Sequence, residues 1–173
     1  MQRARPAIRT ANLDDATSLS RLGGKTFTET FGSMYSAEDL SLFLEQGHSE
    51  EVYRRVLSDP RSRVWIAEET TALVGFLSAG PCDLPVPDKP DSAGEIQRFY
   101  LLNDWQGHGT GGELFGLAME FLKGSFDHIY LSVYAENYGA QRFYERQGFV
   151  KIHAYHYMVG NQADPEFIME WRG

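Results

Sequence analysis

The chain has 173 residues, of which 42% are hydrophobic, and a formal net charge of −8. These values predict a single domain spanning residues 1–173 with one sizeable core. An acidic chain without a lysine and arginine cluster argues against nucleic-acid binding, because phosphate neutralisation supplies much of that affinity. The single cysteine, Cys82, excludes an internal disulfide, and no apolar run approaches the ~18 residues that a membrane span needs. We therefore expect a cytoplasmic protein that binds neither nucleic acid nor membrane.

The chain begins with what reads as a short strand and a long helix. Residues 8–9 carry the strand signal. Asp14 is a suitable N-cap for the helix, because an aspartate side chain can accept hydrogen bonds from the first free backbone N–H groups. The helix is expected to run towards Phe31, with an apolar side chain at every third position of its first half. These positions are Leu13, Ala16, Leu19 and Leu22.

Two shorter helices are predicted next. Ser36 caps the second helix in a Ser-x-x-Asp pattern that resembles a capping box, and Gly47 ends it in the usual position after the last turn. The third helix spans residues 50–57 and stops before Asp59-Pro60, because proline cannot continue a helix.

The pattern then changes to one of strands. Short apolar runs at residues 64–67 and 73–77, with polar residues between them, predict a hairpin. Residues 79–94 contain four of the seven prolines and read as a long loop, which is either a passive surface segment or one wall of a site. A strand is expected to follow at residues 95–102.

The rest of the chain alternates between helices and strands. The helix that follows the strand at 95–102 ends near Lys123 and carries one apolar stripe, so it should pack on a sheet. The later elements are a strand at 129–133, a helix at 138–147, and strands at 149–157 and 166–171. Helices lead, a hairpin follows and a βαβ unit lies centrally, which predicts a mixed α/β fold with a sheet of about seven strands.

Four glycines fall within residues 107–112, directly before an amphipathic helix. Glycine is costly in backbone entropy and is used where φ must be positive or where a ligand approaches the main chain. At a helix N-terminus the free N–H groups and the helix dipole point to the same place and form an anion site. The turn therefore predicts a phosphate-binding site that needs no net positive charge on the protein.

Two other phosphate-binding motifs fit this turn less well. Gly107-x-Gly109-x-x-Gly112 satisfies the dinucleotide fingerprint, and Asp127 lies twenty residues on, where a ribose-binding acid is expected. That fingerprint should leave its strand at once and open a doubly wound sheet, whereas only about sixty residues remain downstream. The Walker pattern is absent, since no lysine follows the glycines. A nicotinamide oxidoreductase stays open as an alternative.

Two blocks of sequence together resemble the GNAT superfamily of N-acetyltransferases. The first is Glu-Ile-x-Arg-Phe-Tyr at 95–100 followed by Gln-x-x-Gly-x-Gly at 106–111. The second is Asn-x-x-Ala-x-x-Phe-Tyr-Glu-x-x-Gly-Phe at 137–149. Both occur in the family's order and near its spacing. The resemblance implies a mostly antiparallel sheet, flanked by helices, that splays between its two central strands into a V-shaped cleft.

The resemblance implies that acetyl-CoA is the cosubstrate and that no metal takes part. The main-chain amides of the glycine turn would hold the pyrophosphate, and residues 99–101 would pair with the pantetheine arm as an added strand. Family members often have arginine where this chain has Gln106, so the amide cradle should bind phosphate with one charge fewer. The residues expected to bind acetyl-CoA are Phe99, Tyr100, Leu101, Gln106, Gly107, His108, Gly109, Thr110, Gly111, Gly112, Asn137 and Tyr144.

The resemblance also implies roles in catalysis. An aliphatic ammonium has a pKa of about 10.4, so a base must remove its proton near neutral pH. Glu95 is the candidate base, and the alternative is a structural salt bridge to Arg98. Tyr144 is the candidate general acid, and the alternative is a ring packed beside Phe143. Asn137, seven positions before Tyr144, shares its helix face and is expected to orient a pantetheine amide. A non-catalytic acyl-CoA-binding module stays open.

The acceptor is the part that the sequence determines least. Residues 26–40 resemble bacterial polyamine (spermidine/spermine) N-acetyltransferases, in which the first two helices flank the acceptor cleft. The expected acceptor-binding residues are Glu29, Phe31 and Tyr35, of which Glu29 offers a carboxylate to a cationic amine. A small cationic amine is therefore expected, while a protein N-terminus, an amino acid or an antibiotic amine stays open. A homodimer is common among such relatives.

Overall fold

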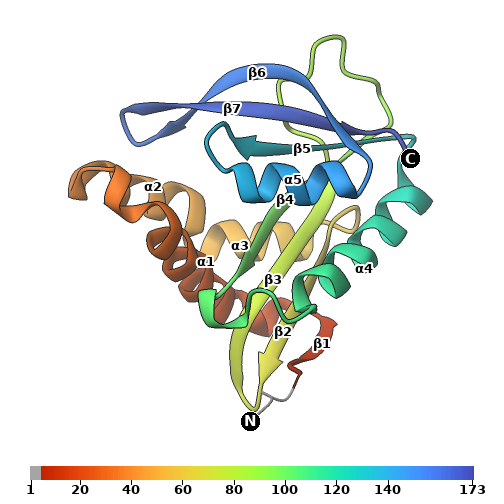
Figure 1. Cartoon of the computed structure of the whole chain (residues 1–173). Coiled ribbons are helices and arrows are strands. Elements are labelled where there is room, and N and C mark those ends of the chain that lie inside the picture. Colours follow the sequence, from red (N-terminus) through yellow and green to blue (C-terminus); the bar gives the residue numbers. More distant parts are fainter. Residues whose placement is uncertain (1–4) are drawn as a thin grey trace.

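A seven-stranded sheet forms the centre of the structure, a computed structural model that describes residues 5–173 (Figure 1). The strands are β1 (Ala7–Thr10), β2 (Arg63–Glu69), β3 (Ala72–Pro81), β4 (Ala93–Leu101), β5 (His128–Tyr134), β6 (Phe149–Val159) and β7 (Gln162–Trp171). The α-helices of this part of the chain are α1 (Ala16–Phe31), α2 (Ala37–His48), α3 (Glu50–Ser58), α4 (Thr110–Ser125) and α5 (Tyr138–Arg146). Short 3₁₀ turns at Leu13–Asp15, Gly32–Met34 and Asn103–Trp105 connect them.

The strand order is β1-β2-β3-β4-β5-β7-β6. The pair β4–β5 is parallel and every other neighbouring pair is antiparallel. Helix α4 makes the crossover between the two parallel strands, because a parallel connection needs a long return segment. The prediction of a mixed, mostly antiparallel α/β sheet of about seven strands is confirmed.

The two central strands, β4 and β5, are paired over only four residues each. Ala93–Ile96 of β4 pair with His128–Leu131 of β5, and the pairing stops there. Beyond this point residues 98–101 pair only with β3, and residues 132–134 pair only with β7. The register of β3 and β4 shifts so that Gln97 has no partner, which is a β-bulge. The two halves of the sheet thus diverge, as the V-shaped cleft requires.

Helices and one loop cover the two faces of this sheet. Helices α4 and α5 cover one face, where Leu114, Ala118 and Leu122 are fully buried in the largest core cluster. Helices α1 and α3 cover the other face over β2–β4, around Leu19 and Phe76. Residues 82–92 pack on the same face over β5 and β7 (Figure 1). The space between α1 and that loop stays open, and it becomes one side of the site.

Two of the predicted helix ends were wrong. Asn12, not Asp14, caps the first helical segment: its side chain accepts from the Asp14 N–H at 2.9 Å. The Asp15 carboxylate completes this capping box by accepting from the Asn12 N–H. Helix α2 continues through Gly47 to His48, and Ser49 then caps α3 by accepting from the Val52 N–H. A side-chain cap for the next helix was available there, so the glycine was not needed as a stop.

Several strands are longer than predicted. The loop predicted at 79–94 is confined to residues 82–92, because β3 extends to Pro81 and β4 begins at Ala93, where Pro81 and Gly94 pair. β6 and β7 stay paired up to the turn at Gly160–Asn161. The polar residues near that turn lie within the strands and do not end them. None of the helices in residues 5–173 combines the length and apolar character that crossing a membrane requires.

Candidate active site

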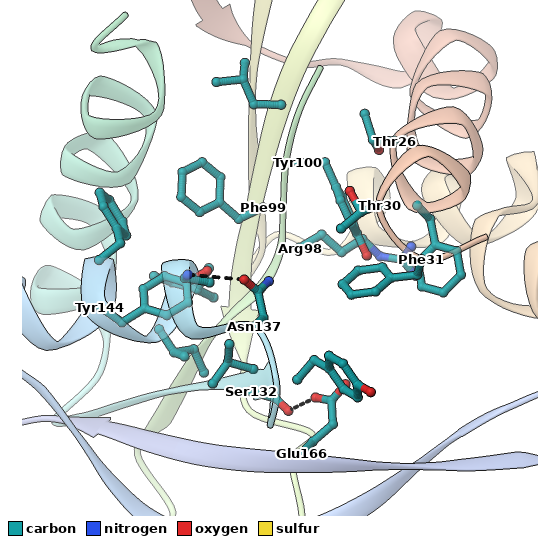
Figure 2. Close-up of a pocket in the computed structure, with 18 of the residues that line it drawn as sticks. Thr26, Thr30, Phe31, Arg98, Phe99, Tyr100, Ser132, Asn137, Tyr144 and Glu166 are labelled. Atoms are coloured by element: carbon teal, nitrogen blue, oxygen red, sulfur yellow. Dashed lines mark hydrogen bonds between the residues drawn. The ribbon is translucent and has the colours of Figure 1, made fainter. Parts of the chain in front are cut away.

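A cavity of about 860 Å³ occupies the splay between β4 and β5 (Figure 2). Its lining comes from α1 and α2 on one side, from the glycine turn and α5 on the other, and from the sheet at its base. Figure 2 shows Phe99 on the side of Tyr144, and Arg98 and Tyr100 on the side of α1. The cavity therefore has two halves, one against the glycine turn and α5 and one against α1 and α2.

The glycine turn leaves an exposed row of main-chain N–H groups at the start of α4. Gly107 and Gly109 have φ values of 79° and 89°, a region that L side chains rarely adopt. Gly109 is the N-cap of α4 and no side chain of residues 5–173 caps the helix, so within this part of the chain its first N–H groups are free for a ligand. A Cβ at Gly107 or Gly112 would meet nothing within 4 Å, which leaves space for an anion against the main chain.

The remaining residues of the turn take different positions. The Gln106 side chain bonds residues that precede the turn. Its Nε2 donates to the Leu101 carbonyl at 3.0 Å and to Asn103 Oδ1 at 3.3 Å. His108 is exposed and Thr110 is buried, and neither lines the cavity. The Arg5 guanidinium lies 4.0 Å from the place of a Cβ on Gly109. Arg5 was not predicted, since it lies a hundred positions away in sequence, and it brings positive charge to the turn.

The inner edge of β4 offers main-chain groups to the same cavity. Residues 98–101 pair with β3 on one side and, within residues 5–173, with no strand on the other. In an antiparallel pair the N–H and C=O groups of alternate residues point away from the partner strand. Those groups of β4 therefore face the splay and are available to an extended ligand with amide groups of its own.

Helix α5 brings Asn137 and Tyr144 to the cavity wall. Asn137 is the N-cap of α5, where its Oδ1 accepts from the Ala140 N–H at 3.2 Å (Figure 2). Tyr144 is 9% exposed and packs against the rings of Phe115, Phe143 and Phe149. Burial raises the pKa of its phenol, so the hydroxyl stays protonated and can donate. Tyr144 is thus both a packed ring and a lining residue with a free hydroxyl donor.

Glu95 lies where β4 and β5 are still paired, at the base of the splay. Its side chain is 8% exposed and lines the cavity. Burial raises the pKa of the carboxyl group to about 7, and the hydrogen bond from the Asp83 N–H partly opposes this. No salt bridge joins it to Arg98, whose guanidinium bonds other residues. A carboxyl group that titrates near neutral pH can act as a general base.

Three further side chains of the sheet form a polar network that sequence reasoning missed. Ser132 of β5 donates to the carboxylate of Glu166 of β7, and its Oγ lies 2.7 Å from the Tyr155 hydroxyl of β6 (Figure 2). Burial raises the pKa of Glu166. Nearby, Tyr35 donates to the buried carboxylate of Asp164. Asp164 and Glu166 are two positions apart on β7 and so share a face of the strand. The sequence contains this period-2 pattern, but the predicted strand began at residue 166 and so did not include Asp164.

Arg98 and His48 form a second polar group, on the side of α1. Arg98 Nη1 lies 3.1 Å from His48 Nδ1 and donates to the Tyr53 hydroxyl at 3.3 Å, while Tyr53 lies 2.8 Å from the same His48 nitrogen. His48 is 3% exposed, and burial together with the Arg98 charge lowers its pKa to about 3. Both Arg98 and His48 line the cavity, and neither was predicted as a site residue.

The structure brings two of the three residues predicted to bind the acceptor into the cavity. Phe31 and Tyr35 line the cavity. Glu29 is exposed and lines a separate groove on the outer face of α1, so the structure does not bring it into this site. Glu29 lies four positions after Lys25, which lines the same outer groove, so the two residues share a helix face. Leu84 brings the 82–92 loop into the lining, as one of the two readings of that loop required.

The residues 5–173 contain no group of three or more His, Cys, Asp or Glu side chains arranged to hold a metal ion. The polar groups of the cavity are instead main-chain and side-chain amides, hydroxyls, phenols, carboxylates, one imidazole and one guanidinium. Such a set suits an organic ligand that carries phosphate and amide groups at one end.

Comparison with known proteins agrees with this geometry. The sequence model of the acetyltransferase (GNAT) family matches residues 26–149. A protein of Lactobacillus delbrueckii subsp. lactis described as an uncharacterized N-acetyltransferase is 27% identical over 162 residues, which cover 92% of this chain and 91% of that protein. An uncharacterized N-acetyltransferase of Mycobacterium tuberculosis is 25% identical over 161 residues, covering 91% of this chain and 97% of that protein.

Solved structures show the same fold at low sequence identity. The PaiA N-acetyltransferase of Thermoplasma acidophilum in complex with coenzyme A has a TM-score of 0.75 and 20% identity, covering 96% of this chain and 98% of that one. NAA60 of Arabidopsis thaliana in complex with a bisubstrate analogue has a TM-score of 0.70 and 16% identity, covering 95% and 97%. The ribosomal-protein-S18-alanine N-acetyltransferase of Escherichia coli has a TM-score of 0.69 and 15% identity, covering 95% and 92%.

Proposed function

The chain belongs to the acetyltransferase (GNAT) family, and on that premise we propose that it transfers the acetyl group of acetyl-CoA directly to a primary amine in a ternary complex. The observation that carries the proposal is the meeting of four features in one cavity. These features are the glycine turn, the unpaired edge of β4, Glu95 and Tyr144. Acetyl-CoA is a cosubstrate here, and it supplies an acetyl group that is activated as a thioester.

The residues around the glycine turn fit the diphosphate of coenzyme A. The free N–H groups at the start of α4 and the helix dipole favour an anion, and the space at Gly107 and Gly112 lets it approach the main chain. Arg5 contributes the positive charge that Gln106 lacks. The unpaired edge at residues 97–101 suits the two amides of the pantetheine arm, and the Asn137 side-chain amide can donate to one of them.

Glu95 is the proposed general base. Its carboxylate accepts the proton that the ammonium of the acceptor loses, so that the neutral amine can attack the thioester carbonyl carbon. The raised pKa of about 7 matches this task, because the carboxylate is present at neutral pH and still basic enough to take a proton. The C–N bond forms as the C–S bond breaks, and the charge that leaves with the sulfur then needs a proton.

Tyr144 is the proposed source of that proton. Its hydroxyl is protonated at neutral pH, lines the cavity and belongs to the helix that begins at Asn137. The rings of Phe115, Phe143 and Phe149 hold the phenol in place, so packing and donation are compatible. An acid held by its neighbours needs little reorganisation in the transition state.

The finer proposal is that the acceptor is a small cationic amine, of which polyamines are the simplest members. Among the described residues, the lining contains three carboxylates, Glu95, Asp164 and Glu166, and one guanidinium, that of Arg98. The aromatic rings of Phe31 and Tyr134 add faces that attract a cation. Both features favour an acceptor with net positive charge.

A panel of amines tests the proposal directly. The purified full chain is incubated with acetyl-CoA and diamines, polyamines, amino acids, aminoglycosides and peptides, and thiol release and the mass of the product are followed. We expect amine-dependent thiol release and an acetylated product. Binding of the coenzyme without thiol release for any amine would identify a non-catalytic module, and quenching of NADH fluorescence would point to the nicotinamide alternative.

A further inference from the structure

Arg98 is a half-buried cation that lines the acceptor half of the cavity without an anionic partner. Its Nη1 bonds His48 and Tyr53, and the guanidinium lies 5.1 Å from the centre of the Tyr53 ring. Within residues 5–173, its Nε and Nη2 have no hydrogen bond and no carboxylate lies within ion-pair distance. Because the half-buried side chain lines the cavity, these two donor groups are available to an acceptor on a ligand.

His48, the neighbour of Arg98, does not neutralise its charge. A guanidinium can only donate hydrogen bonds, so His48 Nδ1 must accept the bond from Arg98 and carries no proton. The ring is neutral because burial and the Arg98 charge lower its pKa to about 3. Its one proton therefore lies on Nε2, a buried atom with no partner in the described chain. Nε2 is too deeply buried to meet a ligand, so His48 is a neutral neighbour that leaves the charge of Arg98 uncompensated, and Arg98 supplies the donors to the cavity.

The lining also contains groups of the opposite charge. Glu95, Asp164 and Glu166 supply the carboxylates of the lining from β4 and β7, while Arg98 extends from β4 towards α1, beside Thr30 and Phe31 (Figure 2). A ligand that carried only amines would be attracted to the carboxylates and repelled by Arg98. A ligand with both an amine and an anion can satisfy both at once.

We propose that Arg98 binds a carboxylate of the acceptor, so that the preferred substrate carries a carboxylate in addition to the amine that becomes acetylated. This inference rests on the proposed acetyl transfer and narrows its acceptor from small cationic amines to amino-acid-like ones. Since the lining has three carboxylates and one guanidinium, the class that fits its charge best is an amino acid with a cationic side chain. The planar fork of the guanidinium matches the two oxygens of a carboxylate.

Pairs of amines that differ only in the carboxylate provide the test. Lysine and cadaverine have the same carbon chain apart from the carboxylate, as do ornithine and putrescine, and lysinamide keeps the carbonyl but not the charge. We expect kcat/KM for lysine and ornithine to exceed that of the matched diamine by at least about tenfold, and lysinamide to behave like the diamine. Equal or lower values for the amino acids would overturn the inference, while thiol release from the diamines would leave the proposed acetyl transfer intact.

The substitution Arg98→Gln tests whether this side chain causes the preference for acceptors with a carboxylate. We expect the ratio of kcat/KM between lysine and cadaverine to fall to about one. The ratio is measured within one variant, so a loss of folded protein cancels, and Arg98→Lys should retain part of the preference because it keeps the charge. Lys25→Gln is the matched control, since Lys25 is exposed on α1 and lines the separate outer groove. An unchanged ratio in Arg98→Gln would contradict the assignment.

Calorimetry on the complex with coenzyme A gives a second reading that does not need turnover. Lysine should bind the wild-type complex at least about tenfold more tightly than cadaverine, and this difference should vanish in Arg98→Gln. Equal affinities in the wild type, or binding of neither compound, would overturn the inference whatever the panel of amines shows.

Discussion

The main-chain N–H of Asp83 donates a hydrogen bond of 3.0 Å to Oε2 of Glu95. This bond joins the 82–92 loop to the strand at the base of the splay. A single hydrogen bond lowers the pKa of a carboxyl group less than deep burial raises it, which leaves the Glu95 pKa at about 7. Glu95 is therefore held in one position by the loop without being fixed in the charged form.

The rate of acetyl transfer should follow the ionisation of Glu95. A general base acts as the carboxylate, so kcat/KM should rise about tenfold per pH unit below pH 7 and level off above it. Glu95→Gln should lose at least about 100-fold in kcat/KM at pH 8 and should lose the step near pH 7. Thiol release measured from pH 5.5 to 9 checks both statements. Glu120→Gln, an exposed change on α4, serves as control, and an identical pH profile in Glu95→Gln would remove Glu95 from the chemistry.

The same carboxyl group should reduce stability at high pH. Its pKa is about 7 in the folded protein and 4.5 in the reference state, so the folded protein holds a proton that the unfolded chain has lost between these values. Wild-type stability from this group is thus fully present below pH 4.5 and is lost as pH rises through 7. Relative to wild type, Glu95→Gln should gain up to about 3 kcal/mol by pH 8, at about 1.4 kcal/mol per pH unit. Urea denaturation at pH 5 and pH 8 measures this, and a gain that is the same at both values would contradict it.

Removing the Tyr144 hydroxyl should slow turnover without weakening cosubstrate binding. The phenol is already packed among aromatic rings, so phenylalanine can take its place in the core. Tyr144→Phe should lower kcat by at least about tenfold, while KM for acetyl-CoA changes little. Tyr138→Phe provides the comparison, because Tyr138 lies on the same helix and is 61% exposed. A decrease of less than about threefold in Tyr144→Phe would show that another group protonates the thiolate.

Side chains on the glycine turn should weaken the binding of acetyl-CoA. Gly109 has a φ of 89°, so alanine there strains the turn that directs the N–H groups of α4. Gly109→Ala should raise KM for acetyl-CoA by about tenfold with a smaller effect on KM for the amine. Gly116→Ala on the same helix has open space and no positive φ, so it should leave KM unchanged and stabilise the helix by about 1 kcal/mol. Equal KM values in the two variants would exclude the turn as the phosphate site.

The acidic face of β7 should matter for the amine, and the outer face of α1 should not. Glu166 lies in the cavity beside Ser132, whereas Glu29 lies in the separate outer groove. Glu166→Gln should raise KM for a cationic amine by about tenfold and leave KM for acetyl-CoA unchanged, while Glu29→Gln should change neither. Steady-state kinetics with one substrate varied at a time distinguishes the two. The reverse result would restore Glu29 as the acceptor-binding carboxylate.

Local patterns in the sequence were enough for most of the fold. The period of the apolar residues located the helices, and the apolar runs located the strands. The helix ends at Asp14 and Gly47 were wrong for related reasons: Asn12 caps the first helical segment in place of Asp14, and α2 continues past Gly47 until Ser49, which is the N-cap of α3. Such a choice depends on which cap fits the packing of the whole helix, and propensity alone does not decide it.

The glycine turn, Glu95 and Tyr144 each belong to one of the two sequence motifs that lie within residues 95–149, which is why they could be proposed in advance. Arg98 and His48 are fifty positions apart in sequence. They meet only because the fold brings the end of α2 next to β4. Tyr35 and Asp164 are 129 positions apart. Contacts at such separations depend on topology, and a single sequence contains no signal for them beyond the strand period that places Asp164 and Glu166 together.

The end of the β4–β5 pairing at Ile96 and Leu131 has a consequence for how far the amino-acid sequence of this chain can change during evolution. The ligand-binding groups on that edge belong to the peptide backbone, which every residue type carries, so a change of side chain there leaves them in place. Only proline removes an N–H. A site built in this way tolerates extensive drift in sequence, and structures that share as little as 15% identity with this chain keep its fold.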